Sequence, residues 1–166
     1  MNFNYFIPFI AFLGLVLGIV LTKIAHEEIR PGRIYLKWFE KFILICLIVG
    51  LFFNISLSYF LFIGVVLGYL SAKFLKDYFY LGLACSLSFL FSLEVFFSLN
   101  VLVFLYGLPR GSFIKKFSDV YKNFLFFAVP LLILFFSSLS PNILNFLIGI
   151  CAGGLFNFVM RSFINF

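Results

Sequence analysis

Charged residues are scarce in this sequence. They make up 11% of the 166 residues, whereas 64% are hydrophobic and the mean hydropathy is +1.20. Soluble globular domains carry about 25% charged residues, so this composition excludes that class and predicts an all-α, polytopic integral membrane protein with a single transmembrane domain. Acidic residues are the scarcer sign, with six against twelve basic ones. Because the basic residues occur only in short breaks between apolar runs, they do not form the basic face of a nucleic-acid-binding protein.

Residue types that build catalytic and metal sites are also few. The chain has one histidine, His26, and three cysteines, Cys46, Cys85 and Cys151, each inside an apolar run and without a C-x-x-C spacing. A metal site needs several such ligands close together, so we expect neither a metal nor a cofactor. A G-x-S-x-G turn and a glycine-rich phosphate loop are lacking as well. These absences argue against an enzyme without excluding one.

The longest polar break is Lys23–Lys41, which holds five of the twelve basic residues and three of the six acidic ones. We expect a turn at Arg30–Arg33, where a proline and a glycine adjoin, and then a short helix along the membrane interface. Arg33, Lys37 and Lys41 recur every four residues and therefore share one face of that helix. No basic residue precedes the first apolar run, so we interpret this run as a retained span and not as a signal peptide.

The apolar runs predict about seven short transmembrane helices. The stretches 42–72 and 78–109 are each too long for one span, and each has a polar break near its middle, at 53–58 and at 92–94. With seven spans, every segment that carries Lys or Arg falls on one side of the membrane, whereas five spans would place several on the other. We therefore expect a multi-pass protein of the cell membrane, with its N-terminus outside and its C-terminus in the cytoplasm. The expected spans are 5–22, 42–53, 57–72, 78–93, 95–108, 123–139 and 143–160.

Three of the expected spans contain the spacing G-x-x-x-G. Phe12–Lys23 and Phe62–Lys73 match at six of twelve positions with an offset of fifty residues. One interpretation is a repeated helical hairpin with a site at the repeat interface, as in some transporters. The favoured interpretation is close helix packing, because small residues let two backbones approach each other in lipid. The glycines of these spans are Gly14, Gly18, Gly64, Gly68, Gly149 and Gly153.

Glu94 is the one acid outside the expected cytoplasmic segments. An ionisable residue at membrane depth suggests a site that carries protons or cations. The alternative, which we favour, is that Glu94 is the solvated tip of an outer turn, because the adjoining span is short and leaves that tip near the headgroups.

Basic residues of two cytoplasmic segments are the other candidates for a site. Arginine suits bidentate contacts to phosphate, and the ligand would be a lipid headgroup or a phosphorylated small molecule. The simpler explanation is that basic loops only orient the protein in the membrane. The residues concerned are Arg30, Arg33, Arg110, Lys115 and Lys116.

Two classes of function follow from these observations. The favoured one is a non-catalytic membrane component or a small transporter, because no acid, base or nucleophile is evident beside the candidate phosphate contacts. The alternative is a lipid-modifying membrane enzyme that holds a phosphate headgroup at the basic cytoplasmic loops. The expected partners are the bilayer and its anionic headgroups, and not nucleic acid, with a homo-oligomer or a second membrane protein left open.

Overall fold

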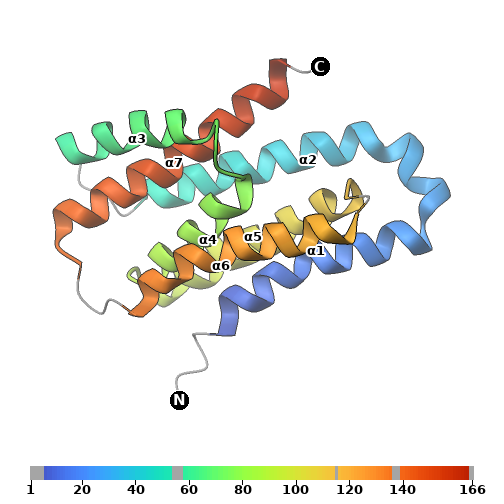
Figure 1. Ribbon diagram of the computed structural model, residues 1–166, viewed down its shortest axis with the longest axis horizontal. Coiled ribbons are helices and arrows are strands. Elements are labelled where there is room, and N and C mark those ends of the chain that lie inside the picture. The colour runs from blue at the N-terminus through green and yellow to red at the C-terminus, as the bar shows by residue number, and fades with distance from the viewer. Residues whose placement is uncertain (1–5, 54–57, 115, 136–138, 165–166) are drawn as a thin grey trace.

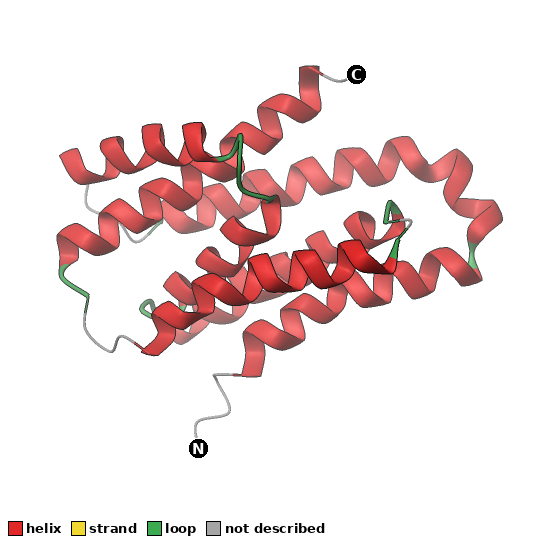
Figure 2. Cartoon of the chain, viewed as in Figure 1, coloured by secondary structure: helices red, strands yellow, loops and turns green. Residues whose placement is uncertain are grey.

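All regular structure in the protein is helical over the residues described. The computed structural model describes residues 6–53, 58–114, 116–135 and 139–164, and these ranges contain seven α-helices and no strand (Figures 1 and 2). The all-α prediction is therefore confirmed for this part of the chain. The helices are α1 (Ile7–Ile24), α2 (His26–Phe52), α3 (Tyr59–Ser71), α4 (Asp77–Ser88), α5 (Leu93–Ser112), α6 (Phe117–Leu131) and α7 (Pro141–Ile164), and the 3-10 segment η2 (Leu132–Phe135) prolongs α6.

Three of the seven helices, and not all seven, are long and apolar enough to cross a membrane. These are α1, α5 and α7, the last measured over Pro141–Phe163. The helix α3 is apolar but has 13 residues, α4 has 12 and α6 has 15, while the 27 residues of α2 include a charged first half. The difference arises because splitting a long apolar run at its polar break leaves pieces below the roughly 20 residues that a lipid-exposed span requires.

The predicted turn at Arg30–Arg33 was wrong, because α2 is helical from His26 onward. Pro31 lies inside this helix, and the chain reverses at Ala25 instead, where φ is −110° and ψ is 40°. Proline already has a helical φ and forfeits one backbone hydrogen bond, a cost that is smallest near a helix end. The interfacial helix and the second expected span are consequently one continuous helix.

Likewise, α5 does not end at Leu108. It continues through Pro109 to Ser112, beyond the expected end of this span at residue 108. Gly107 and Gly111 pack on the backbone of α1, and this contact holds the last turn of α5 in place. Tertiary packing therefore outweighs the local preference of proline for a helix start.

Two parallel helix pairs pack through glycines that meet face to face. In the pair α3 and α7, a Cβ atom on Gly68 would lie 2.1 Å from the carbonyl oxygen of Ile150, and one on Gly153 would lie 2.1 Å from that of Val65. Gly64 and Gly149 make the matching contact one turn earlier. In the pair α1 and α5, Gly14 and Gly18 meet Gly107 and Gly111, the latter a G-x-x-x-G spacing that we did not single out from the sequence. Successive glycines meet in the same order in each pair, so both pairs are parallel.

The short helix α4 is the centre of the bundle. Eleven of its 12 residues are buried, so the neighbouring helices cover it on all sides. Gly82 lies against the backbone of Phe127 in α6, and Gly154 of α7 leaves room for the Tyr80 ring. The buried hydroxyl of Ser86 lies 2.8 Å from the carbonyl oxygen of Gly82 and 2.9 Å from that of Pro130, and it donates to one of them at a time. This buried hydroxyl therefore has a protein partner, as a water-free surrounding requires, whereas the hydroxyl of Tyr78 and the Oδ1 atoms of Asn100 and Asn157 are buried without a hydrogen bond among the described residues.

Large apolar side chains cover the outward faces of the bundle. Leu13 and Leu17 on α1 and Phe62 and Val66 on α3 are all exposed. Soluble monomers rarely expose contiguous apolar faces of this kind. Apolar side chains thus fill the core and also cover the outward faces, and this distribution favours a lipid surrounding.

Candidate functional site at the basic end of the bundle

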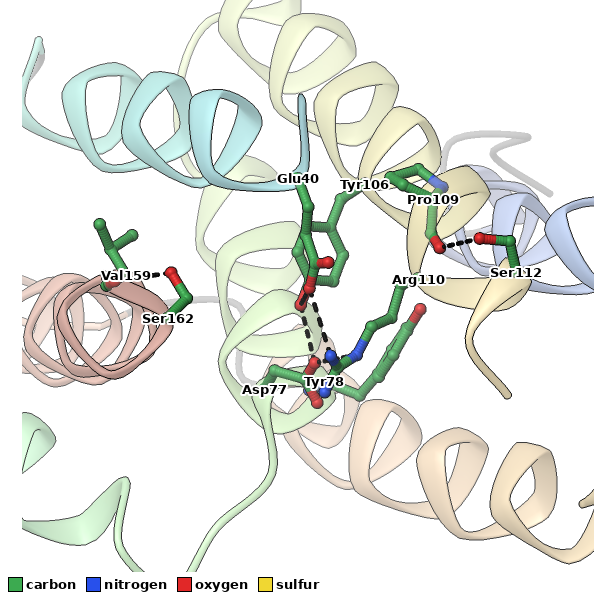
Figure 3. A network of polar contacts seen from close by, with 9 residues as sticks. All are labelled: Glu40, Asp77, Tyr78, Tyr106, Pro109, Arg110, Ser112, Val159 and Ser162. Carbon is green, nitrogen blue, oxygen red and sulfur yellow. Dashed lines mark hydrogen bonds and ion pairs between the residues drawn. The ribbon is translucent and has the colours of Figure 1, made fainter. Parts of the chain in front are cut away.

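Four polar side chains from three helices meet where α4 begins (Figure 3). The Nε atom of Arg110 lies 2.9 Å from Oδ2 of Asp77, and its Nη1 atom lies 3.3 Å from Oε1 of Glu40. The hydroxyl of Tyr106 lies 2.7 Å from Oδ2 of Asp77 and 3.1 Å from Oε1 of Glu40. A hydroxyl has one proton and donates to one carboxylate at a time, and the shorter distance favours Asp77.

Local structure explains how these groups are positioned. Tyr106 and Arg110 are four residues apart on α5 and therefore share a face. Asp77 is the first residue of α4, where the helix dipole stabilises a carboxylate, and its Oδ1 accepts the backbone N–H of Tyr78 at 3.1 Å. The ring of Tyr78 packs edge-on against Tyr106 with 6.1 Å between centroids. These contacts hold Arg110 in one orientation.

The charged side chains of the cluster differ in how much of their surface is exposed. The side chain of Asp77 is 5% exposed and that of Glu40 is 15% exposed, whereas that of Arg110 is 39% exposed. Burial raises the pKa of Glu40 above its ordinary value, although Arg110 opposes this effect and the charge of Asp77 adds to it. Glu40 therefore keeps its proton to a higher pH than a solvated glutamate does.

A cavity of about 420 Å³ opens beside this cluster, and we call it the α2 cavity. Five basic side chains and two carboxylates contribute to its wall, so its charge is net positive. The guanidinium of Arg33 stacks over Phe113 at 5.2 Å, and the ammonium of Lys41 lies 4.1 Å from the centre of the Phe163 ring. The charged residues of the wall are Arg33, Lys37, Glu40, Lys41, Asp77, Arg110 and Arg161.

A second cavity, of about 540 Å³, adjoins the first, and we call it the α3–α4 cavity. Its charged residues are Lys73, Lys76, Asp77, Arg110, Asp119 and Arg161. The ammonium of Lys76 donates to Oδ1 of Asn123 at 3.2 Å, which ties the α3–α4 junction to α6.

Three helices extend past the α3–α4 junction: α2 lines the α2 cavity, α6 lines the α3–α4 cavity, and α7 lines both. The side chain of Asn157 in α7 donates to the carbonyl of Tyr69 near the end of α3, and α7 then continues to Ile164. From Glu40, α2 extends back to His26, a length of about 21 Å at 1.5 Å per residue. The first turns of α6 likewise precede the contact between Asn123 and Lys76. The start of α4 is thus a recessed floor, and Figure 1 shows α2 reaching beyond it.

The structure brings together some of the candidate basic residues. Arg33 and Arg110, from the two polar segments, line the same cavity. Lys116 is exposed at the start of α6 and lines neither cavity. Lys115 and the side chain of Arg30 lie outside the described residues.

Glu94 lies far from this site. It is exposed in the first turn of α5, sixteen residues before Arg110, which is about 24 Å along a helix. A negative charge in the first turn also complements the helix dipole. The interpretation of Glu94 as the solvated tip of an outer turn stays a prediction.

Several residues of the site were not among the sequence candidates. They are Lys37, Glu40, Lys41, Asp77, Tyr106 and Arg161. Asp77 carried a usable signal, since it is an acid at the boundary between a basic segment and an apolar run. Glu40 carried none, because one acid in a charged helix is usually solvated.

Comparisons with known proteins add no identity. No protein-family model, curated protein or solved structure matches the chain. Within the described ranges, no group of three or more His, Cys, Asp or Glu side chains is arranged to hold a metal ion. The function is accordingly argued from the basic cavities and the carboxylates beside them.

Proposed function

We propose that this chain is a multi-pass protein of the cell membrane that binds a phosphate-bearing anion at its cytoplasmic end and does so without catalysis. The observation that carries the proposal is the α2 cavity, where five basic side chains face two carboxylates. A cation excess in a partly enclosed space attracts anions more strongly than the same charges on an open surface. Guanidinium groups also match the geometry of phosphate oxygens.

The proposal includes seven membrane crossings. The length required of a span applies to helices that face lipid, and α4 is enclosed by protein, so its 12 residues do not exclude a crossing. With η2 added to its fifteen residues, α6 gains four more. Seven crossings also place the basic cavities and all basic segments on the cytoplasmic side, in keeping with the positive-inside rule.

A lipid-modifying enzyme is the second candidate. The objection from sequence was the lack of an acid or base near the arginines, and Glu40, Asp77 and Tyr106 now lie beside Arg110. A carboxyl group with a raised pKa is suited to proton transfer. Both carboxylates are, however, engaged by Arg110, and the described residues offer no activated nucleophile beside them. Binding without catalysis therefore has the stronger support.

Anion binding can be tested with matched charge variants. Purified protein in detergent is titrated with inorganic phosphate and with short-chain phosphatidic acid while its thermal stability is followed. We expect both to stabilise the wild type and the stabilisation to fall at least fivefold in Arg33→Gln with Lys37→Gln. Lys116→Gln removes an exposed charge that lines neither cavity and should retain the response. An equal loss of stabilisation in the double variant and in Lys116→Gln would show that the anions respond to overall charge and not to this cavity.

The orientation can be tested by cysteine labelling in intact cells, after replacement of the native cysteines by alanine. Ser92 and Ser140 are exposed at one end of the bundle, and Ser118 is exposed at the other. We expect a membrane-impermeant maleimide to label Ser92→Cys and Ser140→Cys from outside and Ser118→Cys only after lysis. Labelling of Ser118→Cys in intact cells would refute the cytoplasmic placement of the basic cavities.

A further inference from the structure

The two cavities are neighbouring compartments with a common wall. Asp77, Arg110, Phe113, Phe158 and Arg161 line both of them. Each cavity also has basic residues of its own.

The basic residues that belong to only one cavity come from different parts of the fold. Arg33, Lys37 and Lys41 of α2 line the α2 cavity, whereas Lys73 and Lys76 of the α3–α4 junction line the other. Lys76 is bound by a neutral amide, at 3.2 Å, so its charge is not cancelled by that partner. Each compartment therefore has its own positive charge.

Arg110 occupies the wall between the compartments. Its Nε and Nη1 atoms are held by Asp77 and Glu40, and within the described residues no bond to Nη2 is present. A guanidinium group has five N–H donors, so several stay available for a ligand. Its orientation is already fixed by the two carboxylates, which lowers the ordering cost of binding.

The charges of the two compartments together suit a ligand with more than one phosphate. Seven basic and three acidic side chains line them, an excess of four positive charges. A phosphate monoester carries about 1.5 to 2 negative charges at neutral pH, and a second linked phosphate adds roughly one more. The volumes of about 420 and 540 Å³ lie within the range of ligand pockets.

We propose that the ligand of this site is a diphosphate, with one phosphate in each cavity and Arg110 and Arg161 beside the bridging oxygen. This inference rests on the proposed anion-binding function. It identifies the ligand by its diphosphate group, which occurs both in lipids and in soluble nucleotides.

The test compares inorganic phosphate with inorganic pyrophosphate by calorimetry on the detergent-purified protein. We expect pyrophosphate to bind at least tenfold more tightly. Citrate, a polyanion without phosphate, serves as the control for charge alone and should bind no more tightly than phosphate. If phosphate binds and pyrophosphate is no tighter, the diphosphate inference is wrong while the proposed function stands. If neither binds, both are wrong.

Variants in each cavity test whether one diphosphate places a phosphate in both. Arg33→Gln and Lys73→Gln each remove one exposed charge from a different cavity, and both side chains are exposed enough for folding to be unaffected. We expect each variant to weaken pyrophosphate binding at least threefold and only one of them to weaken phosphate binding. Lys116→Gln should change neither. An unchanged affinity for pyrophosphate in Lys73→Gln would refute the placement of a phosphate in the α3–α4 cavity.

The source of the diphosphate is resolved by two further ligands. Farnesyl diphosphate in detergent micelles represents a lipid diphosphate, and ADP represents a soluble one. Tenfold tighter binding of either one than of pyrophosphate assigns the ligand to that source and supports the inference. Exclusion of both esters, with only inorganic pyrophosphate bound, would contradict a diphosphate ester as ligand.

Discussion

Replacing Gly68 by alanine should separate α3 from α7. The added Cβ atom would lie 2.1 Å from the carbonyl oxygen, 2.7 Å from the carbonyl carbon and 2.8 Å from the Cα of Ile150. All three are backbone atoms, so no side-chain rotation relieves the contact. Ordinary van der Waals contact begins at 3.4 Å, so the two backbones must part by about 1.3 Å at this point. That movement also loosens the packing at the other glycines of the pair.

We expect a net loss of about 1–2 kcal/mol in the free energy of unfolding. Overpacking of a tight contact costs about 1–3 kcal/mol, and part of it is offset by the roughly 0.5–1 kcal/mol that alanine gains over glycine within a helix. Gly32 of α2 is the matched control, because a Cβ there meets no atom within 4 Å. Gly32→Ala should therefore be neutral or stabilising.

Thermal and denaturant unfolding in one detergent would measure both variants beside the wild type. Gly50→Ala is an intermediate case, since its nearest contact is the end of the Leu99 side chain at 2.9 Å, which can rotate away. The reasoning predicts the order Gly32→Ala, Gly50→Ala, Gly68→Ala from most to least stable. A Gly68→Ala variant as stable as Gly32→Ala would refute the close approach of α3 and α7.

Three further predictions concern the additivity of the two glycine interfaces, the ion pair of Arg110 with Asp77, and the pH dependence of stability. Gly18→Ala acts at the α1–α5 interface, so in the double variant its loss of unfolding free energy should add to that of Gly68→Ala within about 0.5 kcal/mol. A larger deviation from additivity would mean that the two interfaces are coupled. Arg110→Gln leaves the buried carboxylate of Asp77 without its cation and should lower the free energy of chemical unfolding by about 2–4 kcal/mol. This loss is smaller than for a fully buried ion pair because Arg110 is partly exposed. A loss below about 0.5 kcal/mol would show that the ion pair is solvated. Because the pKa of Glu40 is raised above 4.5 in the folded protein, the folded state keeps this proton to higher pH than the unfolded state does. The free energy of unfolding should therefore fall as the pH rises from 4.5 through the folded pKa, and Glu40→Gln should abolish this pH dependence. An unchanged pH dependence in Glu40→Gln would assign it to another group.

Sequence alone determined the helical and membrane character of the chain, because both depend on local patterns. Long apolar runs with few charges predict helices in lipid wherever they occur. Gly64, Gly68, Gly149 and Gly153 were also visible, since a spacing of four places two glycines on one face of a helix. The number of helices expected in each apolar run agrees with the seven helices of the described residues. Only three of these helices have the length and hydropathy of a membrane span.

Tertiary structure decided where helices end when packing opposes local preference. The expected turn at Arg30–Arg33 contains Pro31 and the expected span end at residue 108 precedes Pro109, yet both prolines lie inside helices. The partner of α1 was equally hidden, because a G-x-x-x-G pattern marks a face that packs closely without naming its neighbour.

The site itself depended on the fold to the greatest degree. Glu40 and Arg110 are 70 residues apart in sequence and lie within 3.3 Å of each other. In a sequence, a charge in a polar segment looks the same whether it is solvated or held by a distant partner. The packing of α4 against α5, α6 and α7 sets the depth at which α4 begins, and that depth places Asp77 on the floor of a basic recess.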